Sequence, residues 1–78
     1  MDYAKIKTSI TKSRSGHYTL TLNYNKWPVY KAVKLNGVSR ARSLADTAKF
    51  LIATKAYQTS TIQGEFVVDR LQRLQGEV

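Results

Sequence analysis

The spacing of the apolar residues changes once along this chain, and that change constrains its fold more than any other feature. Up to about residue 35, apolar and polar residues alternate, as in a β-strand with one buried face. From residue 43 onward, the apolar residues return every three or four positions, which is the spacing of one face of an α-helix. The sequence therefore predicts an antiparallel sheet followed by helices, an α+β fold.

Three strands are predicted from the alternation, over residues 5–11, 17–24 and 29–35. Two segments with turn composition separate them: residues 12–16, which are rich in serine and end in glycine, and residues 25–28, which hold the single proline. Strands joined by such short loops run antiparallel. The first half of the chain is thus expected to form a meander of two hairpins.

The dipeptide Asn36-Gly37 follows the third strand and has the residue types that a type I′ turn favours, because both central residues of that turn need positive φ. It predicts that residues 38–42 fold back as a short fourth strand. Ser43, with Asp46 three residues later, has the pattern of a helix N-cap, so the first helix is expected to begin there.

Two helices are expected after the sheet. The first carries one apolar face, formed by Leu44, Ala48, Leu51, Ile52 and Ala56. A second capping signal at residues 60–63 precedes a segment in which Val67, Leu71 and Leu74 share a face. Residues 65–68 stay open between this helix and an additional edge strand, because their β-branched and aromatic side chains favour a sheet.

These elements are expected to form one basic domain over residues 1–78, a three- to four-stranded antiparallel sheet in the order β-β-β-(β)-α-α, with one face covered by two C-terminal helices. The covered face is expected to hold Ile6, Ile10, Leu20, Leu22, Val33 and Leu35. The opposite face stays open, and the predicted alternation assigns to it Lys5, Lys7, Thr19, Thr21, Asn23, Tyr30 and Lys34.

Composition excludes several classes of protein. The chain has no cysteine and one histidine, so neither a disulfide framework nor a zinc site of cysteines and histidines is expected. It has no glycine-rich phosphate loop and no acidic pair with metal-ligand spacing, so no metal and no cofactor are predicted. The apolar runs are much shorter than a membrane span, and the first residues lack the apolar stretch of a signal peptide. An intracellular, cytoplasmic protein without a membrane contact is expected.

The positive charge is confined to the first half of the chain. The 13 Lys and Arg exceed the 5 Asp and Glu, which gives a net charge of +8. All of the excess lies in residues 1–42, whereas positive and negative side chains balance over residues 43–78. A basic half beside a neutral half is typical of a protein that docks one side onto a polyanion. Nucleic acid, with DNA favoured, is therefore the expected partner, and an acidic surface of a host protein is the alternative.

Candidate contacts follow from the charge and from the expected open face. For nucleic acid they are Lys5, Lys7, Lys12, Arg14, Tyr30, Lys34, Arg40 and Arg42, whose cationic members would neutralise phosphates. Tyr24 and Trp27, beside the second turn, are candidates for a protein interface, and packing at the edge of the core is the first interpretation of Trp27. Because a chain of this length builds only a modest core, a partner or a homodimer would add stability.

No catalytic residue and no small-molecule substrate are predicted. Acid–base catalysis needs titratable groups held together, and this chain has one histidine and five scattered carboxylates. A nuclease-like arrangement of His17 with Glu65 and an arginine is an alternative that the spacing does not select.

From Ser9 to Ile52 the chain resembles the N-terminal arm-binding domains of phage-type tyrosine integrases and the related plant AP2-like fold. Three segments carry the resemblance: residues 10–14 (Ile-Thr-Lys-Ser-Arg), residues 16–18 (Gly-His-Tyr) and residues 43–48 (Ser-Leu-Ala-Asp-Thr-Ala). The resemblance implies three antiparallel strands and a helix, with the sheet in the DNA major groove. Phosphate contacts would then carry over to Lys5, Lys7, Arg14, Lys34 and Arg40. The chain departs from such domains in residues 25–28 and in residues 60–78, and no catalytic domain is expected after it.

In its architecture the chain also resembles small phage anti-CRISPR inhibitors that combine a sheet with two helices. That resemblance implies a protein-interaction module that inhibits a host complex in the host cytoplasm. Two functions are therefore carried forward: a phage or mobile-element protein that binds nucleic acid, and an inhibitor that binds a host protein. Nucleic-acid binding should weaken steeply with salt, and an interface centred on Trp27 should not.

Overall fold

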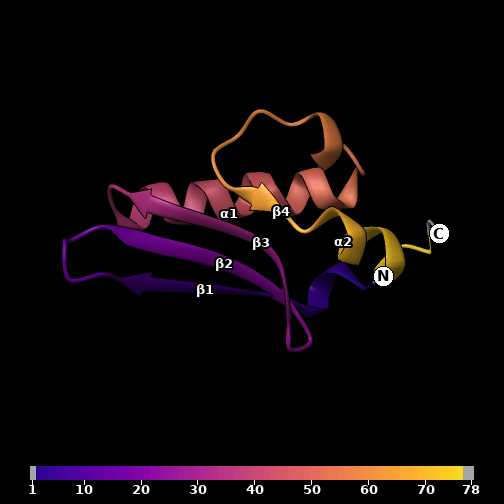
Figure 1. The fold of residues 1–78 in the computed structure, drawn as a ribbon, viewed down its shortest axis with the longest axis horizontal. Coiled ribbons are helices and arrows are strands. Elements are labelled where there is room, and N and C mark those ends of the chain that lie inside the picture. Colours follow the sequence, from indigo (N-terminus) through magenta and orange to yellow (C-terminus); the bar gives the residue numbers. More distant parts are fainter. Residues whose placement is uncertain (1, 77–78) are drawn as a thin grey trace.

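The computed structural model describes residues 2–76 and contains a four-stranded antiparallel sheet in the order β1-β2-β3-β4 (Figure 1). The strands are β1 (Ile6–Lys12), β2 (Tyr18–Tyr24), β3 (Trp27–Leu35) and β4 (Glu65–Phe66). The helices are α1 (Val38–Ala53) and α2 (Val68–Leu74), and two 3-10 turns are η1 (Tyr3–Lys5) and η2 (Tyr57–Thr59). The prediction of an α+β fold, with an antiparallel sheet and two helices that follow the first three strands, is confirmed.

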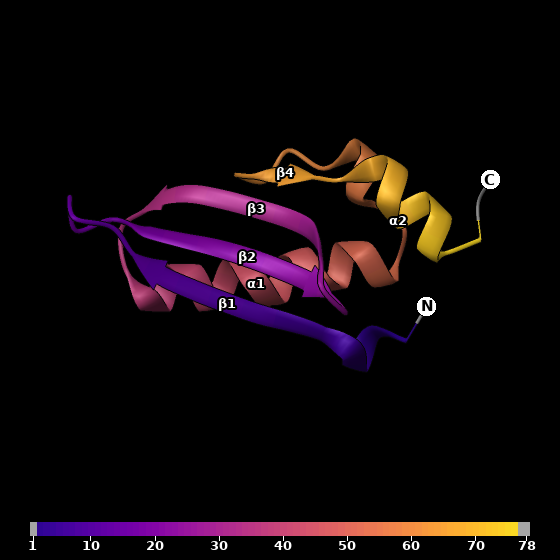
Figure 2. The same ribbon diagram turned by 60° about the horizontal axis from the view of Figure 1, so that its bottom comes forward.

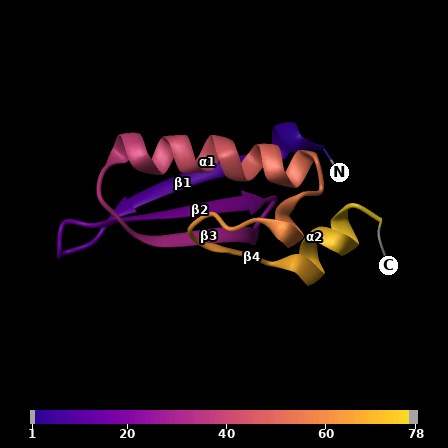
Figure 3. The same ribbon diagram turned by 90° about the horizontal axis from the view of Figure 1, so that it is seen from above.

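The two helices contact different parts of the sheet. α1 lies along one face and contacts β1, β2 and β3 (Figures 1 and 2). α2 lies at the end of the sheet where β3 begins, and its Leu71 is buried (Figure 3). No described element lies over the opposite face of β1, β2 and β3 (Figure 1).

Two tight turns make the meander. In the first, Ser13 N–H donates to the His17 carbonyl at 2.7 Å and Gly16 N–H donates to the Ser13 carbonyl at 3.1 Å. Gly16 has φ +87°, a conformation that glycine adopts without steric cost. The second turn is shorter than predicted: it consists of Asn25, with φ +56°, and Lys26, and β3 already begins at the next residue.

A β-bulge in β3 changes which of its residues face α1. Between Ala32 and Leu35, β3 has one residue more than the segment of β2 that it pairs with, and Lys34 takes a positive φ of 59°. Strict alternation from Leu35 would point Val33 toward the helix. The bulge points Ala32 there instead and leaves Val33 46% exposed on the other face, so the prediction of Val33 as a core residue is wrong.

Tyr30 lies on the covered face and not on the open one. Its side chain is 0% exposed, its ring centroid is 4.6 Å from that of Phe66, and its hydroxyl donates to the Gln63 carbonyl. A second register shift in β3 brings the neighbouring residue Val29 into the core as well, so two consecutive side chains are buried. The prediction of Tyr30 as a nucleic-acid contact is therefore wrong.

α1 begins at Val38, so residues 38–42 are its first turn and not a strand. Gly37 is the N-cap with φ −175°, which is extended backbone and not the positive φ of a type I′ turn. Ser43, predicted as the N-cap, lies inside the helix. The physical reason is Ala41, which shares the buried face of α1 with Leu44 and so continues the helical spacing back through this segment.

The fourth strand lies further along the chain, within the segment 65–68 that was left open between a strand and a helix. The segment is divided between the two. Glu65 and Phe66 pair with Lys31 and Tyr30 as the edge strand β4, and α2 begins at Val68. Residues 60–63, predicted to cap the second helix, belong to the loop before β4. Gly64 closes this loop against Tyr30 with φ +103°.

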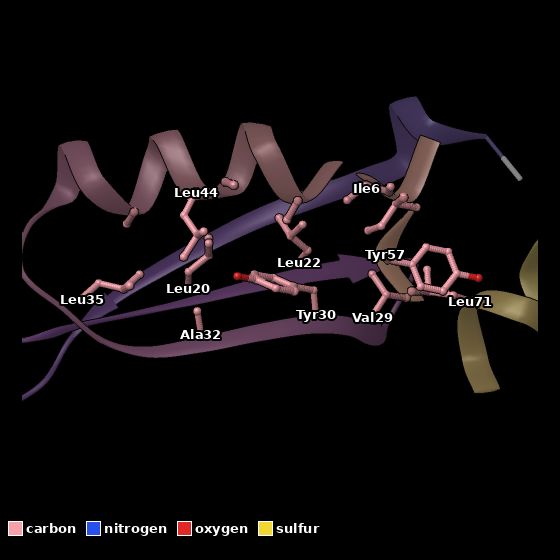
Figure 4. Packing of buried hydrophobic residues seen from close by; sticks show 14 residues of the cluster. Ile6, Leu20, Leu22, Val29, Tyr30, Ala32, Leu35, Leu44, Tyr57 and Leu71 are labelled. Carbon is pink, nitrogen blue, oxygen red and sulfur yellow. The ribbon is translucent and has the colours of Figure 1, made fainter. Parts of the chain in front are cut away.

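The core lies between the sheet and α1 and extends to α2 (Figure 4). It consists of Ile6, Leu20, Leu22, Val29, Tyr30, Ala32 and Leu35 from the sheet, Ala41, Leu44, Ala45, Ala48 and Ile52 from α1, and Tyr57 and Leu71. The three alanines of α1 let its backbone approach the sheet closely. Two tyrosines and several leucines fill the remaining space of the core.

Candidate nucleic-acid interface

The uncovered face of the sheet, called the open face below, is almost entirely polar. The pairing register places on it Lys7, Ser9 and Thr11 of β1, Thr19, Thr21 and Asn23 of β2, Pro28 and Lys31 of β3, and Glu65 of β4. The exposed Val33 of β3 lies on the same face. Paired residues in an antiparallel sheet share a face, so these side chains lie side by side in rows across the strands. The open face thus presents mainly hydroxyl, amide and ammonium groups, with Val33 and Glu65 toward β4.

The positive charges on the open face lie on the two strands that flank β2. Lys7 belongs to β1 and Lys31 to β3, while the strand between them carries the neutral hydrogen-bonding residues Thr19, Thr21 and Asn23. These three side chains are half-buried, which limits their freedom to reorient. Glu65 of β4 lies directly opposite Lys31 and reduces the positive charge at that edge.

The predicted cationic contacts are divided between several places. Lys7 is on the open face, Lys5 is in η1 at its border, Arg14 is in the first turn and Lys34 is at the bulge of β3. Lys12 ends β1, and its Nζ lies 5.9 Å from the centroid of the Tyr18 ring. Arg40 and Arg42 belong to the first turns of α1, on the covered side of the sheet. The fold therefore does not bring all seven cations onto one surface.

Lys31 is a residue of the open face that the sequence prediction missed. The prediction pointed Tyr30 outward, and Lys31 would then have pointed toward the core. The available signal was the neighbouring Ala32, an apolar residue that can be buried in the core. Because neighbouring residues of a strand face opposite sides, a buried Ala32 places Lys31 on the open face.

A second surface, called the Trp27 cluster below, lies at the end of the sheet next to α2. Trp27, Arg70, Arg73 and Leu74 line a shallow hollow there. The guanidinium carbon of Arg70 is 4.9 Å from the centroid of the Trp27 ring, and its Nη1 donates to the carbonyl of Pro28 at 2.9 Å. Trp27 is nonetheless 57% exposed, so one wall of the hollow is an indole ring open to a partner.

The two aromatic candidates for a protein interface are thus separated by the structure. Trp27 is largely exposed in its cluster, whereas Tyr24 is half-buried and packs against the core. The arginines of the cluster were missed because residues 43–78 carry no net charge. Arg70 and Arg73 are one turn apart on α2, and that spacing was the available signal.

The remaining titratable groups give no catalytic arrangement. Burial raises the pKa of Tyr30 to about 12, which keeps its hydroxyl protonated as a donor, and the nearby Arg40 opposes this rise. His17 Nδ1 is 3.1 Å from Ser15 Oγ within the first turn, while Glu65 lies on β4. Among residues 2–76, no group of three or more His, Cys, Asp or Glu side chains is placed to hold a metal ion.

A scan against protein-family models, a search of curated proteins and a search of solved structures each gave no match. Within the described part of the chain, no helix is long and apolar enough to span a bilayer.

Proposed function

We propose that this protein binds nucleic acid, with DNA favoured, through its open face, and that it acts in the cytoplasm as a binding protein without a catalytic centre. The observation that carries the proposal is the order of chemical groups across three strands. Cations lie on β1 and β3, and neutral donors and acceptors lie on β2 between them. Phosphates flank the base edges of a DNA groove in the same order.

The dimensions support this arrangement. The strands that carry Lys7 and Lys31 lie two strand spacings apart, about 10 Å, and the major groove of B-DNA is about 12 Å wide. Lys7 pairs with Asn23 and Lys31 with Thr21, so the two lysines are also offset by two residues along the strands. Their flexible side chains can therefore reach phosphates on both sides of a groove. Thr21 and Asn23 would then face base edges, where a hydroxyl and an amide both donate and accept hydrogen bonds.

Longer-range charge supports the same proposal. A chain with a net charge of +8 attracts polyanions, and Lys5, Arg14 and Lys34 surround the open face at its border and ends. These residues would contact the flanking phosphates. Arg40 and Arg42 lie behind the sheet and would contribute to long-range attraction only.

The test measures the affinity of the protein for a labelled random-sequence DNA duplex and for a labelled single strand. Fluorescence anisotropy reports the binding at each of several salt concentrations. The Lys7→Gln/Lys31→Gln variant is compared with Arg40→Gln/Lys49→Gln, which removes the same charge from α1. The sheet variant is expected to reduce the log–log salt slope by about 2, since each phosphate contact contributes about 0.9. The helix variant should reduce it much less.

Two outcomes would refute the proposal. If the wild-type protein binds neither nucleic acid at low salt, nucleic-acid binding is wrong. If the two double variants lose the same affinity and slope, binding is diffuse and the open face is not the site. A third variant, Thr21→Ala/Asn23→Ala, should change sequence preference while leaving the salt slope unaltered.

The Trp27 cluster favours a second function, the binding of an acidic protein surface. An exposed tryptophan beside two arginines has the composition of an interface hot spot. Under this proposal the protein inhibits a host complex, as the resemblance to anti-CRISPR inhibitors implies. Affinity capture with the wild-type chain should then isolate a host protein, and Trp27→Ala should abolish binding to it. Nucleic-acid binding by the same variant should stay unaltered.

A further inference from the structure

We propose that two copies of this chain associate through the outer edges of their β1 strands and form one continuous eight-stranded sheet. β1 is the first strand in the sheet order, and no described segment pairs with its outer edge (Figure 2). The proposal does not depend on nucleic-acid binding, because it concerns main-chain groups at a different place from the open face.

The main-chain groups available at this edge follow from the first hairpin. Ser13 N–H donates to the His17 carbonyl, and paired residues in an antiparallel ladder alternate between bonded and non-bonded pairs. Thr11, Ser9 and Lys7 therefore direct their N–H and C=O groups toward β2. The other residues, Ile6, Thr8, Ile10 and Lys12, direct theirs outward and form a free ladder edge.

The sequence of β1 is compatible with pairing to itself. The antiparallel register that uses the whole strand is centred on Ser9, and it sets Thr8 opposite the partner's Ile10 and Lys7 opposite the partner's Thr11. No lysine faces a lysine in this register, so the like-charge repulsion that commonly protects edge strands is absent between directly opposite residues. The outward groups of each copy meet those of the other.

The helix behind the edge is complementary in charge. A hollow between β1 and α1 is lined by Thr8, Ile10, Arg42, Ala45 and Asp46. This hollow is level with Ser9, which is where the twofold axis of the dimer would pass. A twofold axis reverses the order of residues on the partner helix, so Arg42 of each copy comes level with the partner's Asp46.

The gap between the two helices suits long side chains. α1 packs chiefly on β2, so the two α1 helices of the dimer lie three strand spacings, about 14 Å, apart. That distance exceeds the 8–10 Å of directly packed helices, and an arginine and an aspartate approaching from opposite sides fill it. Both helices lie on the same side, so the two open faces join into a single surface.

The first experiment measures molar mass by sedimentation equilibrium over concentrations up to about 1 mM, in low and moderate salt. Because each copy carries a charge of +8, moderate salt should strengthen the dimer by screening repulsion. The edge variant is Thr8→Pro, which removes an outward N–H and none that bonds to β2, and the control is Thr8→Ala. Thr8→Pro should be monomeric with an unchanged far-UV spectrum, and Thr8→Ala should still dimerise.

The second experiment uses the charge pair. The Arg42→Asp chain and the Asp46→Arg chain should each fail to self-associate, because equal charges then face each other across the axis. An equimolar mixture of the two should form a heterodimer, in which both facing pairs are again opposite in charge. A wild-type chain that stays monomeric in all conditions would overturn the proposal, and so would a dimer that persists with Thr8→Pro.

Discussion

The replacement Gly64→Ala tests the close contact between the loop before β4 and the buried Tyr30 of β3. A Cβ added at Gly64 would lie 2.5 Å from Tyr30 Oη, 2.7 Å from Tyr30 Cζ and 2.8 Å from the Lys31 carbonyl oxygen. The backbone at this position also has φ +103°, which side chains rarely adopt. The substitution therefore combines conformational strain of about 1–3 kcal/mol with overpacking of about 1–3 kcal/mol.

The expected loss is about 2–6 kcal/mol in the free energy of unfolding. A domain of this size is stable by about 4–12 kcal/mol, so the variant loses a large share of its stability. Urea unfolding, followed by far-UV circular dichroism, should show a midpoint lowered by roughly 2 M or more, because the slope for a small domain is about 1 kcal/mol per M.

Gly16→Ala is the matched control, because Gly16 has a positive φ of 87° but no atom within 4 Å of an added Cβ. It should cost only the conformational strain, about 1–2 kcal/mol. If Gly64→Ala destabilises the protein no more than Gly16→Ala does, the close contact between residue 64 and Tyr30 is refuted.

Three further changes test other parts of the structure. Because burial raises the pKa of Tyr30 to about 12 from the ordinary value near 10, the folded state holds this proton more tightly. The contribution of Tyr30 to stability should be constant below pH 10 and fall by about 2–3 kcal/mol as the pH rises from 10 through 12. Urea titrations across this range should show a fall that is larger in the wild type than in Tyr30→Phe by this amount. Leu71→Ala should cost about 2–5 kcal/mol in the same assay, because Leu71 is completely buried, and a loss below 1 kcal/mol would mean that α2 is not part of the core. Arg70→Ala should cost about 1 kcal/mol and shift the emission of Trp27, the single tryptophan, since its stacked guanidinium and the bond to Pro28 are lost; an unchanged spectrum would contradict the stacking.

The class of fold was predictable from the sequence because apolar periodicity reports which face of an element is buried. It indicated β1 and β2 within a residue or so of their observed ends. The fourth strand was misplaced for a local reason: Asn36-Gly37 has the composition of a hairpin turn, yet Gly37 serves as an extended N-cap. Turn composition is a local signal, and the packing of Ala41 against the sheet outweighed it.

The candidate site was predicted less well because β-bulges leave no clear trace in the sequence. Each bulge in β3 shifts the alternation by one residue, and so the predicted faces of Tyr30 and Val33 were inverted and Lys31 was missed on the open face. Lys7, on the regular strand β1, was placed correctly. The assignment of side chains to faces was therefore reliable where the strand is regular and failed where it is not.

The hydrogen bond from Tyr30 to the Gln63 carbonyl joins residues 33 positions apart and has a consequence for the order of folding. The contacts among β1, β2, β3 and α1 connect segments that follow one another along the chain, so their loop-closure cost is low. Phe66 and Leu71, which complete the core around Tyr30 and Val29, lie beyond all of these segments. The three-stranded sheet and α1 are therefore expected to form first, and the arrival of β4 at the edge of β3 is expected to be the last step of folding.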